Sequence, residues 1–292
     1  MRSLLFVPAD SPKKLDRAAA AGADALIVDL EDSVAPARKP LAREAAAEFL
    51  RARRATAGAP VLIVRINALE TGLADADIEA VVPAAPDLIM LPKARGRAAV
   101  AELDAKLTAQ EALHARPDGG IGILPIATET AESLFLSGTY RGASVRLRAL
   151  TWGAEDLSAD IGAETNRDEA GLFTDPYRIA RAFCLLGAAA AEVPAIDTVF
   201  VDFRDPAGLR AEAEAARRDG FDGKMAIHPD QVAIINEVFT PTAEAIAQSE
   251  RIVAAFAADP GAGVVGIDGR MVDRPHLRRA ERLLARAGRA RP

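Results

Sequence analysis

Short apolar runs recur along this chain, and a polar or charged residue closes nearly every one of them. Each run is rich in Val, Ile and Leu, and a stretch with helical periodicity follows it. We expect eight strands, at 4–8, 25–32, 61–67, 88–93, 120–128, 147–153, 196–202 and 223–229. Strands that alternate with helices in this way form parallel sheets.

Eight such repeats favour a closed (β/α)8 TIM barrel of the α/β class over an open sheet, and we expect it to occupy residues 1–240. Functional side chains of this fold gather at the carboxyl ends of the strands, so the residues that close the apolar runs are the candidates for chemistry. Residues 241–292 predict a helix, a hairpin and a second helix that have no place in the barrel. We expect them to form a lid or an oligomerisation extension.

Composition and charge exclude several classes of protein. The chain has 36 Lys and Arg against 42 Asp and Glu, a net charge of -6, which argues against a general nucleic-acid binder. No apolar stretch is long enough for a membrane span, and the N-terminus does not have the pattern of a secretory signal, so we expect a cytoplasmic protein with no membrane partner. Cys184 is the only cysteine, so no intrachain disulfide can form.

Two carboxylates follow neighbouring predicted strands. Glu129 comes after the fifth strand and Asp156 after the sixth, and no histidine lies near either in the sequence. Because adjacent strands of a sheet lie about 4.8 Å apart, these side chains can converge into an oxygen site that favours Mg²⁺. The alternative is that both acids cap the helices that follow them.

Arg65 ends an otherwise apolar strand, where a guanidinium suits bidentate binding of a substrate carboxylate. The alternative is a structural ion pair with an acid of the second strand. Lys93 is a second candidate for an anion site. Glu31 and Asp32 are candidates to hold Arg65 and metal-bound waters, or to cap the next turn.

His228 closes the eighth strand and is a candidate ligand contact, although the adjacent Pro229 equally indicates a structural turn. Asp273 lies in the predicted C-terminal hairpin, where a carboxylate on a lid suits acid–base catalysis, and the alternative is a helix cap. No Ser-His-Asp, Cys-His or zinc-type cluster can be assembled from the sequence.

Several segments together resemble the citrate lyase beta subunit family, which comprises citryl-CoA, malyl-CoA and citramalyl-CoA lyases. The resemblance runs in the family's order from residue 2 to about 285, and GAEDL and GKMAIHPDQ are its most diagnostic segments. The segments are RSLLFVPAD, LIVDLEDSV, VRIN, LPKA, ATETAES, LTWGAEDLSADIG, GFDGKMAIHPDQVAIINEVFTP and IDGRMVDRPHLRRA.

The resemblance implies a TIM barrel that reversibly cleaves a carbon–carbon bond of a 3-hydroxyacyl thioester. It implies that Glu129 and Asp156 hold Mg²⁺ and that Arg65 binds the 2-oxo acid. It places Glu31 and Asp32 beside the metal's waters, and it implies that Asp273 completes the site of a neighbouring subunit in a trimer or hexamer. Basic groups near the N-terminus, Arg2 first among them, would meet the phosphates of the thioester carrier.

The sequence therefore predicts a Mg²⁺-dependent lyase that releases acetyl-CoA and a 2-oxo acid from an acyl-CoA. The first alternative is a citrate lyase beta subunit that works with an acyl-carrier protein. The second is a barrel that binds a 2-oxo acid or CoA ester without turning it over.

Overall fold

A computed structural model describes residues 1–54 and 56–290 of the chain. The chain divides into two compact units, Met1–Asn236 and Glu237–Pro292. The sequence placed this boundary at residue 240. None of the helices in the described ranges is both long and apolar enough to cross a membrane.

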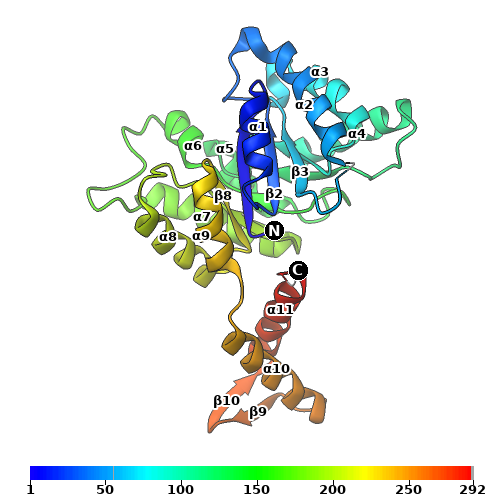
Figure 1. Ribbon diagram of the computed structural model, residues 1–292. Helices are drawn as coiled ribbons and strands as arrows, with labels where there is room; N and C mark the ends of the chain where they lie inside the picture. The colour runs from blue at the N-terminus through cyan, green and yellow to red at the C-terminus, as the bar shows by residue number, and fades with distance from the viewer. Residues whose placement is uncertain (55, 291–292) are drawn as a thin grey trace. The chain divides into compact units, whose positions relative to one another are not determined.

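Eight parallel strands form the sheet of the first unit (Figure 1). Their order, β5-β4-β3-β2-β1-β8-β7-β6, brings the first and last repeats together at the β1–β8 pair. Bridges from Ile123 to Leu147 and from Ile126 to Thr151 close the remaining gap between β5 and β6. The strands are β1 (Ser3–Pro8), β2 (Ala25–Asp29), β3 (Val61–Arg65), β4 (Leu88–Leu91), β5 (Gly122–Pro125), β6 (Leu150–Thr151), β7 (Ala195–Asp197) and β8 (Gly223–Ala226). The predicted barrel is confirmed.

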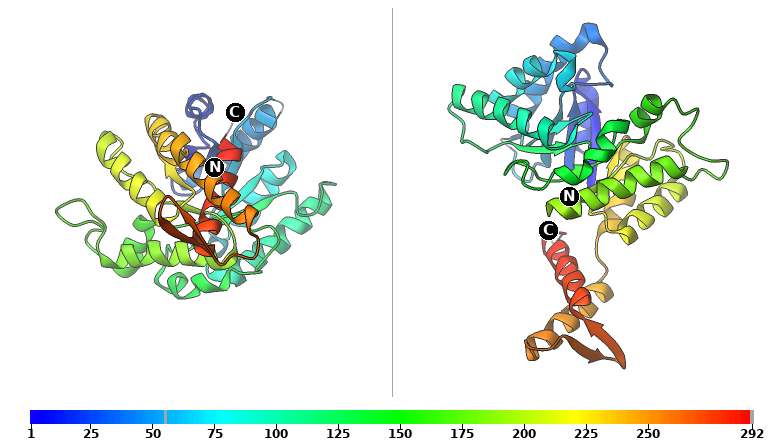
Figure 2. Two further views of the ribbon diagram at one scale, coloured as in Figure 1. Left: turned by 90° about the horizontal axis from the view of Figure 1, so that it is seen from below. Right: turned by 180° about the vertical axis from the view of Figure 1, so that it is seen from behind.

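Helices follow the strands and surround them, as Figure 2 shows. They are α1 (Pro12–Ala19), α2 (Lys39–Arg54), α3 (Ala74–Val81), α4 (Gly96–Leu113), α5 (Ala131–Leu136), α6 (Ala154–Ile161), α7 (Asp175–Ala191), α8 (Pro206–Asp219) and α9 (Pro229–Phe239). Their apolar sides cover the strands, and the central strand β2 is buried on both of its faces. This burial explains why its apolar run is continuous and does not alternate with polar residues.

The barrel interior is filled by apolar side chains from seven of the eight strands and by Ala149 next to β6. Among them are Leu4, Ile27, Ile63, Leu124 and Met225. The low aromatic content of the chain matches this packing. The barrel interior is therefore a packed core and not a pore.

The sequence overestimated the length of β7. The predicted strand ran to Asp202, but β7 ends at Asp197, whose carboxylate is buried against Lys224 of β8. The chain then leaves the sheet as a loop, and Gln231 holds this loop by donating to the carbonyl of Phe200. Asp202 is consequently exposed and does not close a strand.

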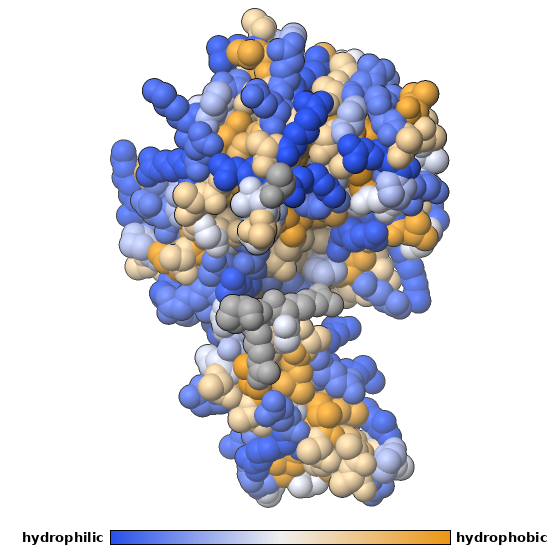
Figure 3. Space-filling view, turned by 45° about the vertical axis from the view of Figure 1, so that its right-hand side comes forward, coloured by the Kyte–Doolittle hydropathy of each residue, from blue (hydrophilic) through white to orange (hydrophobic). Residues whose placement is uncertain are grey.

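The second unit consists of α10 (Ala243–Ala258), the hairpin of β9 (Val264–Ile267) and β10 (Arg270–Asp273), and α11 (Arg274–Ala290). The predicted order of helix, hairpin and helix is confirmed. A small core cluster of this unit holds Phe256, Ile267 and Val272. Figure 3 shows further apolar side chains at the surface of this unit.

Candidate active site at the barrel rim

A cavity of about 330 Å³ lies at the carboxyl ends of the strands, the end at which this fold carries chemistry. Its apolar wall includes Phe6, Ile126, Trp152, Val199, Met225 and Ile227. Its charged wall consists of Asp29, Asp32, Arg65, Glu129, Glu155 and Asp156. Four of the nine site residues singled out from the sequence therefore line this cavity: Asp32, Arg65, Glu129 and Asp156.

Glu129 lies in the loop between β5 and α5 and is almost fully buried, with 3% of its surface exposed. It does not cap α5, because Thr130 and Ser133 form the capping box there. Burial raises the pKa of Glu129 well above its usual value, and the nearby charge of Asp156 raises this pKa further. The capping alternative for Glu129 is therefore wrong.

Asp156 lies in the first turn of α6, where a negative charge is favourable, but its carboxylate also contacts the ammonium of Lys93 at 3.0 Å. Gly153 precedes this helix and packs against Glu129. A Cβ at Gly153 would lie 2.9 Å from both Cγ and Oε1 of Glu129. The absence of a side chain at Gly153 thus lets the start of α6 approach Glu129 closely.

Arg65 is tied to acids from the second strand, as the structural alternative proposed. Its Nε and Nη2 donate to the two carboxylate oxygens of Asp29, each at 2.7 Å, and its Nη1 lies 3.0 Å from Oε2 of Glu31. The ring of Phe6 packs against the guanidinium at 4.8 Å. Since a guanidinium has five N–H groups, two remain for a substrate carboxylate.

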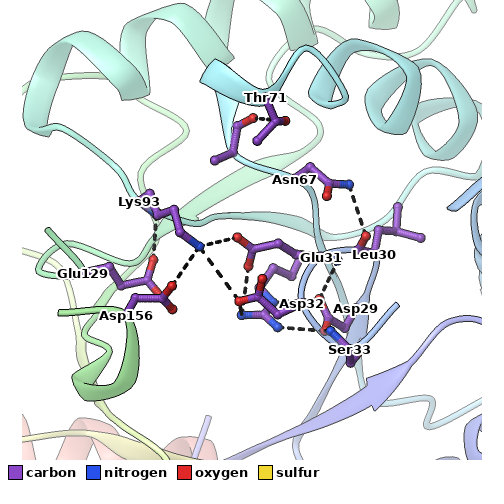
Figure 4. A network of polar contacts seen from close by, with 12 residues as sticks. Asp29, Leu30, Glu31, Asp32, Ser33, Asn67, Thr71, Lys93, Glu129 and Asp156 are labelled. Atoms are coloured by element: carbon purple, nitrogen blue, oxygen red, sulfur yellow. Dashed lines mark hydrogen bonds and ion pairs between the residues drawn. The ribbon is translucent and has the colours of Figure 1, made fainter. Parts of the chain in front are cut away.

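Lys93 joins the two groups of acids (Figure 4). Its backbone N–H donates to Oε2 of Glu129 at 2.6 Å. Its Nζ donates to Oε1 of Glu31 at 2.7 Å and contacts Asp156. Asp32, which is mostly exposed, lies 3.9 Å from the same Nζ. The ammonium is thus engaged by the chain's own carboxylates.

The cluster carries more negative than positive charge, because five carboxylates (Asp29, Glu31, Asp32, Glu129 and Asp156) face only Arg65 and Lys93. Burial also raises the pKa of Glu31, and the neighbouring Arg65 and Lys93 only partly oppose this effect. An oxygen-rich site with a deficit of positive charge fits a divalent cation such as Mg²⁺. Within residues 1–54 and 56–290, no three His, Cys, Asp or Glu side chains form a metal site by themselves. The fit is therefore to two protein ligands completed by water and substrate.

Two residues that the sequence predicted to bind substrate lie away from this cavity. Arg2 lies at the amino end of β1, which is the opposite end of the barrel, and its guanidinium binds Asp24 there through Nε at 3.0 Å and Nη2 at 2.7 Å. The role of Arg2 in meeting a carrier's phosphates at the rim is therefore corrected. His228 follows β8, but its ring stacks on Phe203 with centroids 4.7 Å apart and does not line the cavity.

Asp273 lies in β10 of the C-terminal unit. Its carboxylate is hydrogen bonded to Nδ1 of His276, and this bond lowers the pKa of Asp273. The assignment of Asp273 to the active site stays a prediction.

Sequence reasoning missed Gly153 and Trp152 as parts of the site. Trp152 lines the cavity and donates from Nε1 to Asp197 at 2.8 Å. Both residues belong to the TWG segment that ends the sixth apolar run, and this position was the available signal.

Comparison with known proteins gives a consistent result over nearly the whole chain. Residues 2–229 match the HpcH/HpaI aldolase/citrate lyase family. The chain is 35% identical to citrate lyase subunit beta of Leuconostoc mesenteroides subsp. cremoris, over 97% of this chain and 92% of that protein. It is 37% identical to (3S)-malyl-CoA thioesterase of Cereibacter sphaeroides, over 98% of this chain and 94% of that protein.

A solved structure of protein CitE from Mycobacterium tuberculosis, in complex with magnesium, acetoacetate and coenzyme A, is similar with a TM-score of 0.77. The two chains are 36% identical, and the match covers 98% of each. These comparisons confirm the barrel fold and the family resemblance expected from the sequence. They also confirm the expectation of a lyase. The chain belongs to the HpcH/HpaI aldolase/citrate lyase family of enzymes.

Proposed function

We propose that this chain is a Mg²⁺-dependent lyase that reversibly cleaves a 3-hydroxyacyl-CoA thioester into acetyl-CoA and a 2-oxo acid. Citramalyl-CoA, malyl-CoA and citryl-CoA are the substrates of this class. The observation that carries the proposal is the convergence of Glu129 and Asp156 beside Arg65 in a cavity with a deficit of positive charge. The magnesium and coenzyme A of the CitE structure support the same class of ligands.

Glu129 and Asp156 would hold the metal, together with water and substrate oxygens. When bound, Mg²⁺ would supply Lewis-acid stabilisation of the negative charge that develops on the substrate hydroxyl oxygen. Arg65 would bind the substrate carboxylate through its two uncommitted N–H groups, and Asp29 and Glu31 would keep the guanidinium in place. Asp32 is exposed at the rim, where it would bind ordered waters.

Asp273 would move the proton at the methyl carbon of the acetyl group. The hydrogen bond with His276 lowers the pKa of this carboxylate, so at neutral pH it is ionised and carries no proton. That state suits the condensing direction, in which a base removes a methyl proton. In cleavage the protonated carboxyl would give this proton to the enolate carbon, and the proton of the substrate hydroxyl would pass to solvent. The role of Asp273 therefore requires the C-terminal unit to reach a barrel rim, in its own or a neighbouring chain.

A panel of hydroxyacyl-CoA esters, assayed with Mg²⁺ and again after chelation, tests the proposal. The lyase reaction releases a 2-oxo acid and leaves the thioester intact, so both the 2-oxo acid and free thiol should be measured. We expect Mg²⁺-dependent 2-oxo acid without free thiol. Free thiol without 2-oxo acid would instead indicate a thioesterase, the activity for which the relative from C. sphaeroides is named.

The same panel separates the remaining alternatives. Activity that appears only after an acyl-carrier protein replaces coenzyme A would favour a citrate lyase beta subunit, as in the relative from L. mesenteroides. Binding of CoA esters with no turnover under any of these conditions would favour the second alternative, a barrel that binds its ligand without catalysis.

We also propose that the chain self-associates, as expected for a trimer or hexamer. Helix α7 exposes Ile179, Phe183 and Leu186 at helical spacing, with exposed fractions of 50%, 41% and 67%. No charged residue occurs between Ala182 and Ala191 of this helix. A contiguous apolar helix face on the surface is typical of a protein interface.

Light scattering tests this surface with a matched pair of variants. Leu186→Glu should shift the protein toward a smaller assembly, because it buries a charge in the interface. Leu113→Glu, at an exposed leucine that ends α4, should leave the assembly unchanged. An unchanged mass for Leu186→Glu would exclude α7 from the interface.

A further inference from the structure

Lys93 has a backbone conformation that a lysine rarely adopts. It follows β4 and has a φ of 50°, in the left-handed region that favours glycine. The turn around it is fixed by its surroundings: a Cβ at Gly96 would lie 2.4 Å from Oγ1 of Thr139, and the buried Tyr140 donates from its hydroxyl to the carbonyl of Ala94 at 3.1 Å. A strained residue in a rigid turn at a candidate active site indicates a functional requirement.

This conformation lets one residue contact both proposed metal ligands through different atoms. The backbone N–H points to Glu129, at 2.6 Å, while the side chain extends to Asp156, at 3.0 Å, and to Glu31, at 2.7 Å (Figure 4). The backbone contact survives any substitution at this position except proline. The side-chain contacts depend on the ammonium.

We propose that Lys93 is a positioning residue whose ammonium is the built-in cation of the carboxylate cluster and competes with a divalent metal ion for Asp156. The backbone N–H of Lys93 orients Glu129 whether or not metal is bound. The ammonium holds Glu31 and Asp156 together in the metal-free protein and releases Asp156 when the metal binds. The inference rests on the proposed function for the identity of the ion and of its two ligands.

The surroundings of the ammonium support this exchange. The Lys93 side chain is 31% exposed and that of Asp156 is 29% exposed, so both can rearrange toward solvent. Glu31 is buried and also lies 3.0 Å from Arg65, so it cannot move toward solvent. When the metal displaces the ammonium from Asp156, the contact between Lys93 and Glu31 therefore remains. No other cation contacts Asp156 among the ion pairs of the described residues. Lys93 therefore weakens metal binding while it keeps the empty cluster ordered.

Calorimetric titration of the metal-free protein with Mg²⁺ tests the competition. Lys93→Met should bind Mg²⁺ about tenfold more tightly than the original chain, because the ion no longer displaces or adjoins a unit positive charge. Lys93→Arg keeps the charge and should bind with nearly the original affinity. Lys106→Met, which removes an exposed lysine paired with Asp75 on the outside of the barrel, should change nothing.

Lys93→Gly provides a second variant that removes the ammonium and accepts the positive φ without strain. It should also bind Mg²⁺ more tightly. Unchanged or weaker binding in both Lys93→Met and Lys93→Gly would overturn the competition, since a merely structural lysine gives one of those two results.

Thermal unfolding in chelator tests the ion bridge without any metal. Lys93→Met should lower the Tm, and it should lower it less in an Asp156→Asn background, because the contact with Asp156 is already lost there while the contact with Glu31 is still present. Additive effects of the two substitutions would overturn the proposed bridge. Failure of the proposed lyase activity, with the affinity pattern and the non-additive Tm intact, would leave this inference standing.

Discussion

Among the clusters of buried charge in the barrel, the one at the rim and the one behind β7 and β8 differ in charge balance. The cluster behind the strands joins three cations to three carboxylates: Lys224, Arg181 and Arg167 with Asp197, Glu212 and Asp219. The rim cluster has five carboxylates and two cations. Both clusters are extensively hydrogen bonded, so the number of contacts does not distinguish them.

The pKa directions show what the difference means. Burial opposes the charge of Asp197, but Lys224 and Arg181 outweigh this effect and lower the pKa of Asp197. Burial raises the pKa of Glu129, and Asp156 adds to the increase. A balanced cluster is complete within the chain, whereas the rim cluster lacks a cation. We infer that the first cluster stabilises the fold and the second binds a ligand.

The largest expected effect concerns the rim. Asp156→Ala should lower lyase turnover by about 10³-fold or more, because a Lewis acid contributes several kcal/mol to such a reaction. The circular dichroism spectrum should be unchanged, since Asp156 is partly exposed on the first turn of α6. Turnover within a few-fold of the original would remove Asp156 from the site.

The second prediction concerns the balanced cluster. Lys224→Met should lower the free energy of unfolding by about 3–5 kcal/mol, because it leaves Asp197 and Glu212 without their buried partner. Denaturant unfolding measures this loss, and turnover per folded molecule should be preserved. A stable variant with impaired catalysis would reverse the roles of the two clusters.

The two clusters should also show opposite pH dependence in metal-free protein. Glu129 has a raised pKa, so its contribution to stability is present below about pH 4.5 and is lost as the pH rises through its folded pKa. Asp197 has a lowered pKa, so its contribution is present above about pH 3.8 and is lost as the pH falls through its folded pKa.

Unfolding of Glu129→Gln and Asp197→Asn across this range checks both signs. Relative to the original chain, Glu129→Gln should gain stability as the pH rises above about 4.5, by about 1.4 kcal/mol for each unit of pKa difference. Relative to the original chain, Asp197→Asn should lose stability as the pH rises from the lowered pKa of Asp197 to about 3.8. Parallel profiles for the two variants would contradict the comparison.

The smallest expected effect is a steric one. Gly153→Ala should weaken Mg²⁺ binding several-fold, because the added Cβ would displace Glu129. Gly138→Ala is the matched control, since a Cβ there meets no atom within 4 Å and should leave Mg²⁺ affinity unchanged. Equal Mg²⁺ affinity in the two variants would show that the close approach of Gly153 does not position Glu129.

The sequence predicted the barrel because apolar runs and helical periodicity are local properties, and it predicted the rim because strand ends coincide with polar residues. It could not predict that Arg2 pairs with Asp24 at the opposite end, since the run that begins near Arg2 gives no partner for it. The extent of β7 was missed because the apolar run continues beyond Asp197, the residue at which the strand ends.

The role of Lys93 was equally hidden from the sequence. Its position at a strand end suggested an anion site, but its partners Glu31, Glu129 and Asp156 come from three other segments: the loop after β2, the loop after β5 and the first turn of α6. Its left-handed backbone is imposed by the packing around Gly96, which lies three residues further along the chain. The balance of charge in a cluster can be counted only once the fold has brought such distant segments together.

Titration of metal-free protein with Mg²⁺, for the original chain, Glu129→Gln, Asp156→Ala and Lys224→Met, tests the central claim most directly. One ion should bind per chain in the original protein and in Lys224→Met, and binding should be lost in Glu129→Gln and Asp156→Ala. Unchanged Mg²⁺ affinity in the two rim variants would contradict the account, because the missing cation of the rim would then have no site there.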